Sequence, residues 1–328
     1  MSWLARLRPD PFLMAIIVAA LLGSFLPVTG AGIQVMDWLT TAAIALLFFL
    51  YGARLSPQET LTGLRHWRLH LTILGFTYLV FPVVGVVIAL VAGNWLSPTM
   101  VTGLVYLTLV PSTVQSSIAF TSIARGNVAG AVVSASASNI LGVFLTPALC
   151  WLVLSGRIAF TTQAIVDILL QLLLPFVLGQ LSRRWTAGFV KSHPQLKLGD
   201  RGSIVLVVYA AFAAGMRENM WAQTSLGEIA ILIAICLVVL AFMLWLSWSV
   251  ARRLGFSVED AIAIQFCGTK KSLASGLPMA AVLFAGSPIG LVMLPLMVFH
   301  QAQLMACASL AGRYARRPDG EPAPSPAG

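Results

Sequence analysis

The chain has 328 residues, of which 59% are hydrophobic and only 9% are charged, and its mean hydropathy is +0.91. A soluble globular domain carries about a quarter charged residues, so this composition excludes one and indicates a helical membrane protein. The net charge of +9 does not indicate nucleic-acid binding, because the basic residues lie in short loops between apolar segments and form no basic patch beside a nucleic-acid-binding motif.

Ten apolar segments follow one another along the chain, most of them near the length of about 20 residues that crosses a bilayer. They are residues 11–28, 35–53, 69–92, 99–123, 127–153, 158–181, 201–217, 226–251, 258–283 and 288–311. The first segment, which follows Arg6 and Arg8, also has features of a signal peptide, and the seventh is short. The sequence therefore predicts an all-α integral membrane protein with ten transmembrane helices.

The distribution of basic residues predicts the orientation of these helices. With a cytoplasmic N-terminus, only Arg157 and Arg217 of the 20 Lys and Arg residues fall on the opposite side. Lys270 and Lys271 fall inside a span, which leaves 16 on the cytoplasmic side. Because cytoplasmic loops are enriched in Lys and Arg, this partition predicts a multi-pass protein of a bacterial-type inner membrane with both termini in the cytoplasm.

The ten segments divide into two halves of five. Because five is an odd number, the halves have opposite orientations, which is the inverted-repeat arrangement of many secondary transporters. The final stretch of the chain is rich in Pro, Ala and Gly and lacks apolar periodicity, which predicts disorder. The predicted organisation is a cytoplasmic N-terminus (1–10), two five-helix repeats (11–153 and 158–311) and a disordered tail (318–328).

The fourth span of each half is interrupted by polar residues, at 111–117 and at 268–278. Paired interruptions at corresponding positions indicate a binding site near the membrane midplane. Pro111 removes a helical hydrogen bond and Gly268 weakens the helix, and freed backbone groups survive at this depth only inside protein or along a wet cavity. Taken singly, Pro111 is also compatible with a simple kink, and the serines with helix packing.

These interruptions contain most of the predicted substrate- and ion-binding residues. Hydroxyl groups there could cap half-helices whose positive ends face an anion. A satisfied interior contact is the simpler interpretation of one secondary candidate, His300. The main candidates are Ser112, Thr113, Gln115, Ser116, Ser117, Thr269, Lys270, Lys271 and Ser272, and the secondary candidates are Asn139, Gln265, His300 and Gln301.

Lys270 and Lys271 are the most unusual residues of the sequence. A charge at the centre of a span costs about 2.5 to 3.5 kcal/mol on insertion scales. The two side chains either extend to an interface or take part in transport, as the partner of an anion or as a proton carrier. The string from Gly268 to Ser272 is similar to the end of a phosphate-binding loop, but the upstream glycine and the preceding strand are missing.

The remaining reactive residue types do not predict an enzyme or a cofactor. The cysteines Cys150, Cys236, Cys267 and Cys307 lie in apolar segments without metal-binding spacing, so they are expected to be packing residues. The sequence has no HExxH motif, no paired aspartates inside a span and no Ser and His pair at reactive spacing.

From Pro11 to Arg313 the chain resembles the bile acid:sodium symporter superfamily. The resemblance rests on Pro111, on residues 124–129 and 145–147, and on the interruption at 268–276. It implies a core domain and a panel domain, with broken helices four and nine that cross at the binding site. It also implies sodium-driven uptake of organic anions.

Several sodium ligands of that superfamily are replaced in this chain. The replacing residues are Thr77, Ile118, Phe266 beside Gln265, Lys270 and Lys271. In this respect the sequence resembles a divergent branch of the superfamily, the one grouped with its seventh vertebrate member. Ser117 matches a position at which members of the superfamily supply a hydroxyl ligand to sodium. The resemblance therefore still allows a sodium site at Ser117. At least one of Lys270 and Lys271 is expected to supply a permanent positive charge in place of a bound cation.

The sequence therefore predicts a secondary-active transporter that moves a small organic anion by alternating access, and it does not predict an enzyme. Sodium or a proton is the expected coupling ion. The alternative is an ion channel, or a regulator of ion homeostasis, without stoichiometric solute transport. Saturable uptake with counterflow would favour the carrier over the channel.

Overall fold

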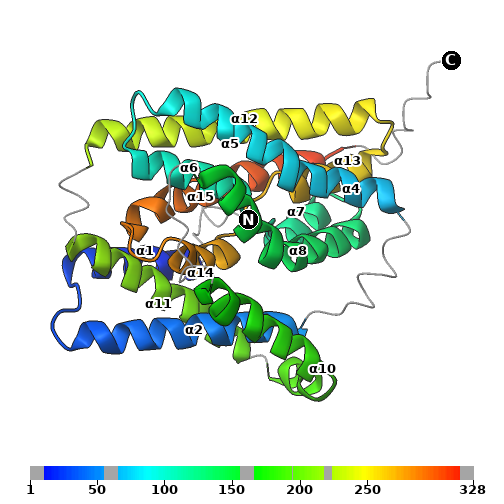
Figure 1. Cartoon of the computed structure of the whole chain (residues 1–328). Coiled ribbons are helices and arrows are strands. Elements are labelled where there is room, and N and C mark those ends of the chain that lie inside the picture. Colours follow the sequence, from blue (N-terminus) through cyan, green and yellow to red (C-terminus); the bar gives the residue numbers. More distant parts are fainter. Residues whose placement is uncertain (1–10, 55–65, 156–165, 194, 218–223, 318–328) are drawn as a thin grey trace. The chain divides into compact units, whose positions relative to one another are not determined.

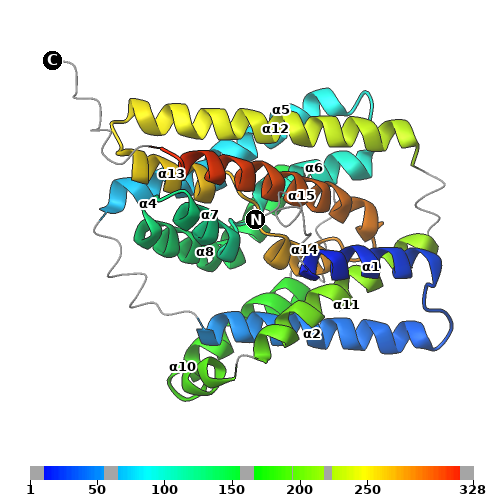
Figure 2. The same cartoon turned by 180° about the vertical axis from the view of Figure 1, so that it is seen from behind.

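The computed structural model describes residues 11–54, 66–155, 166–193, 195–217 and 224–317. All regular secondary structure in these ranges is helical (Figures 1 and 2), which confirms the predicted all-α class. The predicted N-terminal segment 1–10 and the predicted tail 318–328 lie outside the described residues.

Six helices in the described part of the chain are long and apolar enough to cross a membrane, and two shorter apolar helices accompany them. The predicted fourth and ninth spans each consist of two short helices. The number of crossings, their orientation and the inverted repeats stay predictions. The six long helices are Gly32–Ala53, Trp67–Ala92, Val128–Leu154, Val166–Thr186, Leu226–Arg253 and Ile289–Tyr314, and the two shorter ones are Met14–Phe25 and Pro98–Leu109.

The chain forms two compact units, of which the first comprises Met1–Arg54, Thr161–Thr224 and Leu277–Leu291. In this unit α2 packs on α10 and α1 packs on α11. Its elements are α1 (Pro11–Phe25), α2 (Gly32–Arg54), the π-helical turn η4 (Leu169–Leu173), α10 (Leu174–Ser192) and α11 (Leu196–Arg217).

Glycines allow α2 and α10 to approach each other closely. A Cβ atom on Gly52 would lie 2.1 Å from the Phe176 carbonyl oxygen, and one on Gly179 would lie 2.1 Å from the Phe49 carbonyl oxygen. Small residues at contacts of this kind are typical of membrane helices, because van der Waals packing of the two backbones holds them together.

The second unit comprises Leu55–Phe160, Ser225–Gly276 and Val292–Gly328. Side-chain caps begin several of its helices: Ser97, Asn127 and Ser257 each accept a backbone N–H of the first turn, and Ser225 forms a capping box with Glu228. Its complete elements are α4 (Trp67–Gly75), the π-helical turn η3 (Phe76–Val80), α5 (Phe81–Ala92), α6 (Pro98–Leu109), α7 (Gln115–Ile123), α8 (Val128–Leu154), α12 (Leu226–Arg253) and α13 (Val258–Gly268).

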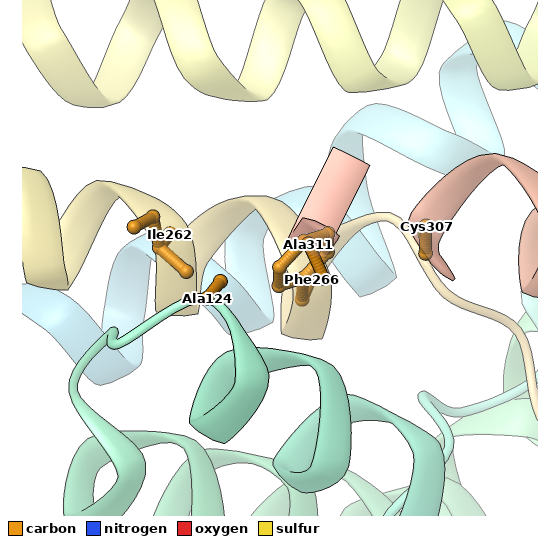
Figure 3. Packing of buried hydrophobic residues seen from close by; sticks show 5 residues of the cluster. All are labelled: Ala124, Ile262, Phe266, Cys307 and Ala311. Carbon is orange, nitrogen blue, oxygen red and sulfur yellow. The ribbon is translucent and has the colours of Figure 1, made fainter. Parts of the chain in front are cut away.

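Two further helices, α14 (Leu273–Leu283) and α15 (Ile289–Tyr314), are each divided between the two units. The part of α15 in the second unit helps to form an apolar cluster with α13 and the end of α7. This cluster consists of Ala124, Ile262, Phe266, Cys307 and Ala311 (Figure 3). All four cysteines are buried in helices, and none forms a disulfide.

Candidate functional site

The first helix break lies between α6, which ends at Leu109, and α7, which begins at Gln115. Val110 has an extended backbone, with φ −77° and ψ 156°. This conformation follows from the sequence, because the ring of Pro111 disfavours a helical conformation in the preceding residue and Pro111 itself has no N–H to donate. The predicted discontinuity of the fourth span is confirmed.

The second break lies between the end of α13 at Gly268 and the start of α14 at Leu273. Residues 269–272 are all buried. Gly268 allows this segment to approach η3, because a Cβ atom at this position would lie 3.0 Å from the Cβ of Phe76. The predicted interruption of the ninth span is therefore also present.

The two breaks contact each other directly inside the second unit. The Ser272 N–H donates to the Pro111 carbonyl at 2.8 Å, and the Ser112 hydroxyl donates to the Cys267 carbonyl at 2.6 Å. The Ser117 hydroxyl donates to the Phe266 carbonyl at 3.1 Å. The end of each broken helix is thus hydrogen-bonded to the other.

The five consecutive carbonyl groups of residues 108–112 show how the first break is stabilised. Buried backbone carbonyls need hydrogen-bond partners, and each of these five finds one outside its own helix. The donors are Lys271 Nζ to residues 108 and 110, Thr146 Oγ1 to 109, Ser272 N to 111 and Asn139 Nδ2 to 112. Three of these five bonds are donated by residues of the second break. The second break therefore supplies most of the hydrogen bonds that these carbonyls need.

The Lys271 side chain is fully buried and makes a complete set of hydrogen bonds. Its Nζ lies 3.0 Å from the carbonyl oxygen of Thr77, 2.7 Å from that of Thr108 and 2.9 Å from that of Val110. An ammonium group has three donors, so all three are used. Nζ also lies 4.3 Å from the ring centroid of Phe81, within the range of a cation–π contact.

The neighbouring Lys270 is equally buried, but its surroundings are apolar. Among the residues that the structure describes, its Nζ has no hydrogen-bond partner. The Nζ instead lies 3.8 Å from the ring centroid of Phe120 and 5.9 Å from that of Phe266. The alternative that the two lysines extend to an interface is wrong, because neither side chain reaches the surface.

Negative side chains are missing from the sequence around these lysines. In the segments that form the site, residues 67–92, 98–154 and 258–314, the only acidic residues are Glu259 and Asp260, which lie in the first turn of α13, about ten residues before the lysines. Because the donors of Lys271 are already used, the Lys270 amine is the group in these segments that can bind a negatively charged group. A divalent cation is poorly suited to this site, because Ca²⁺ sites draw on carboxylate ligands.

Asn139 and Ser275 extend the network around the breaks. The Asn139 amide donates to the Ser112 carbonyl at 2.7 Å and accepts from the Ser275 hydroxyl at 2.8 Å. The Ser272 hydroxyl donates to the Ser275 hydroxyl and accepts the Ser275 N–H, both at 3.1 Å. The structure thus places the predicted Asn139 at the site and adds Ser275, which was not among the residues predicted from the sequence.

A second residue missed from the sequence is Gln303, which is fully buried. Its side-chain amide accepts the Lys271 N–H at 2.9 Å and donates to the Lys271 carbonyl at 2.8 Å. His300 Nδ1 lies 3.2 Å from the same carbonyl oxygen and 2.8 Å from Gln303 Nε2. The spacing of one helical turn after His300 could have indicated Gln303.

Some predicted residues lie away from the contact between the breaks. Gln265 faces α12 and the end of α15, where it donates to the Leu244 carbonyl and accepts from the Tyr314 hydroxyl, both at 2.9 Å. Gln115 is exposed. Gln301 Oε1 is buried without a hydrogen-bond partner among the described residues, and no contact places it at the breaks.

The remaining predicted hydroxyl groups form hydrogen bonds with residues three or four positions away in the sequence. Thr113 Oγ1 lies 2.8 Å from Ser116 Oγ and 3.0 Å from Ser117 Oγ. The Thr269 hydroxyl donates to the Gln265 carbonyl, one turn earlier in α13. Ser117 is the position at which the family resemblance allows a sodium ligand. Its hydroxyl is therefore already hydrogen-bonded within the protein.

Comparison with known proteins shows that the sequence of this chain is similar to those of membrane transporters. Residues 10–316 match the model of the SBF-like CPA transporter family. The chain is 50% identical to protein PA2026 of Pseudomonas aeruginosa, over 96% of this chain and 95% of the relative. It is 47% identical to the Escherichia coli K12 protein named "Putative symporter YfeH" (94% and 93%), and 30% identical to mouse sodium/bile acid cotransporter 7 (93% and 92%).

Proposed function

Because this chain belongs to the SBF-like CPA transporter family, we propose that it is a secondary-active transporter of a small organic anion. The coarser assignment, a multi-pass membrane transporter and not an enzyme, follows from the family. The class of solute and the mechanism of alternating access are the proposed parts. Both proposed parts assume that the solute binds at the contact between the two breaks, where Lys270 and Lys271 lie.

The surroundings of Lys270 are the observation that carries the proposal. Its amine is buried beside two aromatic rings and has no hydrogen-bond partner in the described part of the chain. A buried ammonium in apolar surroundings is costly unless an anion neutralises it. An anionic solute would supply both the negative charge and the hydrogen-bond acceptors that this amine lacks.

The same proposal extends to the architecture. We assign the second unit, which contains both breaks, to the core domain and the first unit to the panel domain. Ten crossings in two inverted repeats, residues 11–153 and 158–311, would place the two breaks at equivalent positions of the repeats. The partition of basic residues supports both termini in the cytoplasm and insertion in a bacterial inner membrane.

Coupling to sodium is not part of the proposal, although the names of some relatives contain sodium. The site already holds two amines, and the one candidate sodium ligand, Ser117, bonds to the Phe266 carbonyl. A proton is the remaining candidate for the coupling ion.

A thermal-shift screen followed by uptake in proteoliposomes tests the proposal. The purified protein is heated with a panel of carboxylates, sulfonates and steroid anions such as taurocholate, with sodium or choline as the cation. A bound solute raises the unfolding midpoint, and it is then tested for saturable uptake and counterflow. Flux that is linear in concentration without trans-stimulation would contradict the proposal and favour an ion channel or a regulator of ion homeostasis.

A further inference from the structure

The turn between α7 and α8 belongs to a stretch that carries the family resemblance, and it lies against the start of α13. A Cβ atom on Gly126 would lie 2.6 Å from the Cγ2 atom of Ile262, so glycine allows this close approach. The Asn127 N–H donates to the Glu259 carbonyl at 3.0 Å, and the Asn127 side-chain amide donates to the Asp260 carboxylate at 2.7 Å. The turn is thus fixed to α13 by packing and by hydrogen bonds.

Helix α7 ends in a Schellman motif that has an arginine where glycine is usual. The Arg125 N–H donates to the Ser122 carbonyl at 3.0 Å and the Gly126 N–H donates to the Thr121 carbonyl at 2.8 Å, which are the two bonds of this motif. Arg125 has a φ of 53°, and it is the only non-glycine residue with a positive φ in the described part of the chain. The same motif at the end of α12 has Gly255 in this position, with a φ of 76°. A side chain in this left-handed region carries a conformational cost that glycine avoids, and the contacts of Arg125 offset it.

Arg125 exchanges hydrogen bonds with Arg317, which follows the end of α15. The Arg317 guanidinium donates to the Ala124 carbonyl at 2.9 Å and to the Arg125 carbonyl at 2.7 Å, and the Arg125 guanidinium donates to the Arg317 carbonyl. The Glu259 carboxylate lies 2.9 Å from Arg317 Nη2 and forms an ion pair with it, which offsets repulsion between the two guanidinium groups. Arg125 and Arg317, here called the arginine clamp, therefore join the ends of α7 and α15 to the start of α13.

The helix ends that the arginine clamp joins carry the aromatic rings beside the Lys270 amine. Phe120 lies one turn before Ala124, whose N–H donates to the Phe120 carbonyl at 2.9 Å. Ala124 and Phe266 belong to one apolar cluster (Figure 3). The ring centroid of Phe266 lies 6.2 Å from that of Phe120 and 6.2 Å from that of Tyr314, at the end of α15. A shift of α7 or α13 at these ends would therefore move a ring that surrounds Lys270.

We propose that the arginine clamp holds Phe120 and Phe266 in place around the Lys270 amine. Arg317 is then a positioning residue, because its side-chain hydrogen bonds go to the ends of the helices that carry these rings and not to the amine. The clamp also explains the arginine in a glycine position, since a glycine at Arg125 would lack the side-chain bond to Arg317. The clamp follows from its contacts alone, whereas its importance for transport rests on the proposed function.

The native cysteines can report whether the clamp holds this region. Cys307 belongs to the apolar cluster that contains Phe266, whereas Cys150 and Cys236 lie in the halves of α8 and α12 away from the clamp. The full-length protein in detergent is treated with N-ethylmaleimide, and mass spectrometry gives the labelling rate of each cysteine. All three thiols are buried, so labelling requires local opening. In Arg317→Gln we expect Cys307 to react about tenfold faster than in the wild type, because hydrogen bonds from a charged group are lost. Cys150 and Cys236 should keep their wild-type rates.

Arg316→Gln is the matched control, because Arg316 is exposed and its side chain donates to the Gly312 carbonyl of α15 at 3.2 Å. Cys307 should keep its wild-type rate in this variant. Should Arg317→Gln fail to accumulate, Arg125→Gly replaces it in the same assay, because glycine adopts a positive φ without cost and removes a side-chain bond of the clamp. A Cys307 rate in the clamp variant equal to that of Arg316→Gln, or a uniform rise at all buried cysteines, would overturn the proposal. Because the assay uses no solute, a negative result leaves the transport proposal unaffected.

Discussion

At the scale of single residues, two adjacent lysines of the same chemistry have opposite surroundings. Lys271 donates to three carbonyl oxygens, whereas the Lys270 amine lies against Phe120 with no hydrogen-bond partner among the described residues. The difference arises because the backbone between α13 and α14 is not helical, so consecutive side chains enter different environments. Lys271 therefore supplies hydrogen bonds that buried backbone carbonyls need, whereas the Lys270 amine is available to bind a ligand.

Replacing Lys270 should therefore affect transport more than folding. In Lys270→Gln an anionic solute loses its charged partner, and breaking a buried charge pair costs about 3–5 kcal/mol, which lowers uptake by about two to four orders of magnitude. Initial uptake rates in proteoliposomes measure the effect. The exposed Arg253 supplies the control variant Arg253→Gln, which should transport normally. Equal uptake by the two variants would remove Lys270 from the site.

Gln303 should contribute to stability through the two hydrogen bonds that it makes with the Lys271 backbone. The substitution Gln303→Leu leaves the buried Lys271 N–H without its acceptor, at about 1–3 kcal/mol, whereas the Lys271 carbonyl keeps His300 Nδ1 at 3.2 Å. Thermal or denaturant unfolding in detergent measures the loss. Gln301→Leu is the control, because Gln301 Oε1 has no hydrogen-bond partner in the described chain and its removal should cost little. A similar loss in both variants would argue against the role of Gln303.

At the scale of the elements, the sequence was sufficient to locate both breaks but not the turn η3 that faces them. Pro111 and the polar residues at 268–272 are local signals. The π-helical turn at Phe76–Val80 has only Pro82 as a local signal, and its role depends on Lys271, far away in sequence. The direction of Gln265 toward α12 likewise depends on helix packing that no local pattern specifies.

The contact between α2 and α10 gives a prediction at this scale. Gly179→Ala places a Cβ atom 2.1 Å from the Phe49 carbonyl, so the helices must separate, and overpacking of this kind costs about 1–3 kcal/mol. Gly188→Ala in the same helix has nothing within 4 Å and should be neutral or stabilising by about 0.5–1 kcal/mol. Unfolding midpoints of the two variants decide the matter, and an equal midpoint would contradict the close packing.

At the scale of the whole molecule, composition and the ten apolar segments were enough to predict an all-helical membrane protein. The described helices overlap the predicted segments, because burial in lipid requires each segment to satisfy its own backbone, although the helix of the sixth segment continues to Ser192 and not to residue 181. The hydrogen-bonded contact between the breaks could not be derived in detail. It depends on which polar groups of distant segments meet, as Gln303 and Ser275 illustrate.

Topology is the prediction that belongs to this scale. Both termini should be cytoplasmic, because only this arrangement gives the partition of Lys and Arg residues, in which Arg157 and Arg217 alone lie on the other side. Reporter fusions at Gly328 and in the segment around Arg157 measure it: a cytoplasmic reporter should be active at the first site and a periplasmic one at the second. A periplasmic reporter active at Gly328 would exclude the inverted repeats.

The most direct test of the account is the cation dependence of solute binding in the wild type and in the Lys270→Gln and Lys271→Gln variants. An anionic solute identified by thermal shift is titrated with sodium or choline as the only cation. The account predicts nearly equal affinity in both salts for the wild type, and a loss of binding by orders of magnitude in Lys270→Gln. Binding that strictly requires sodium and survives both substitutions would contradict it.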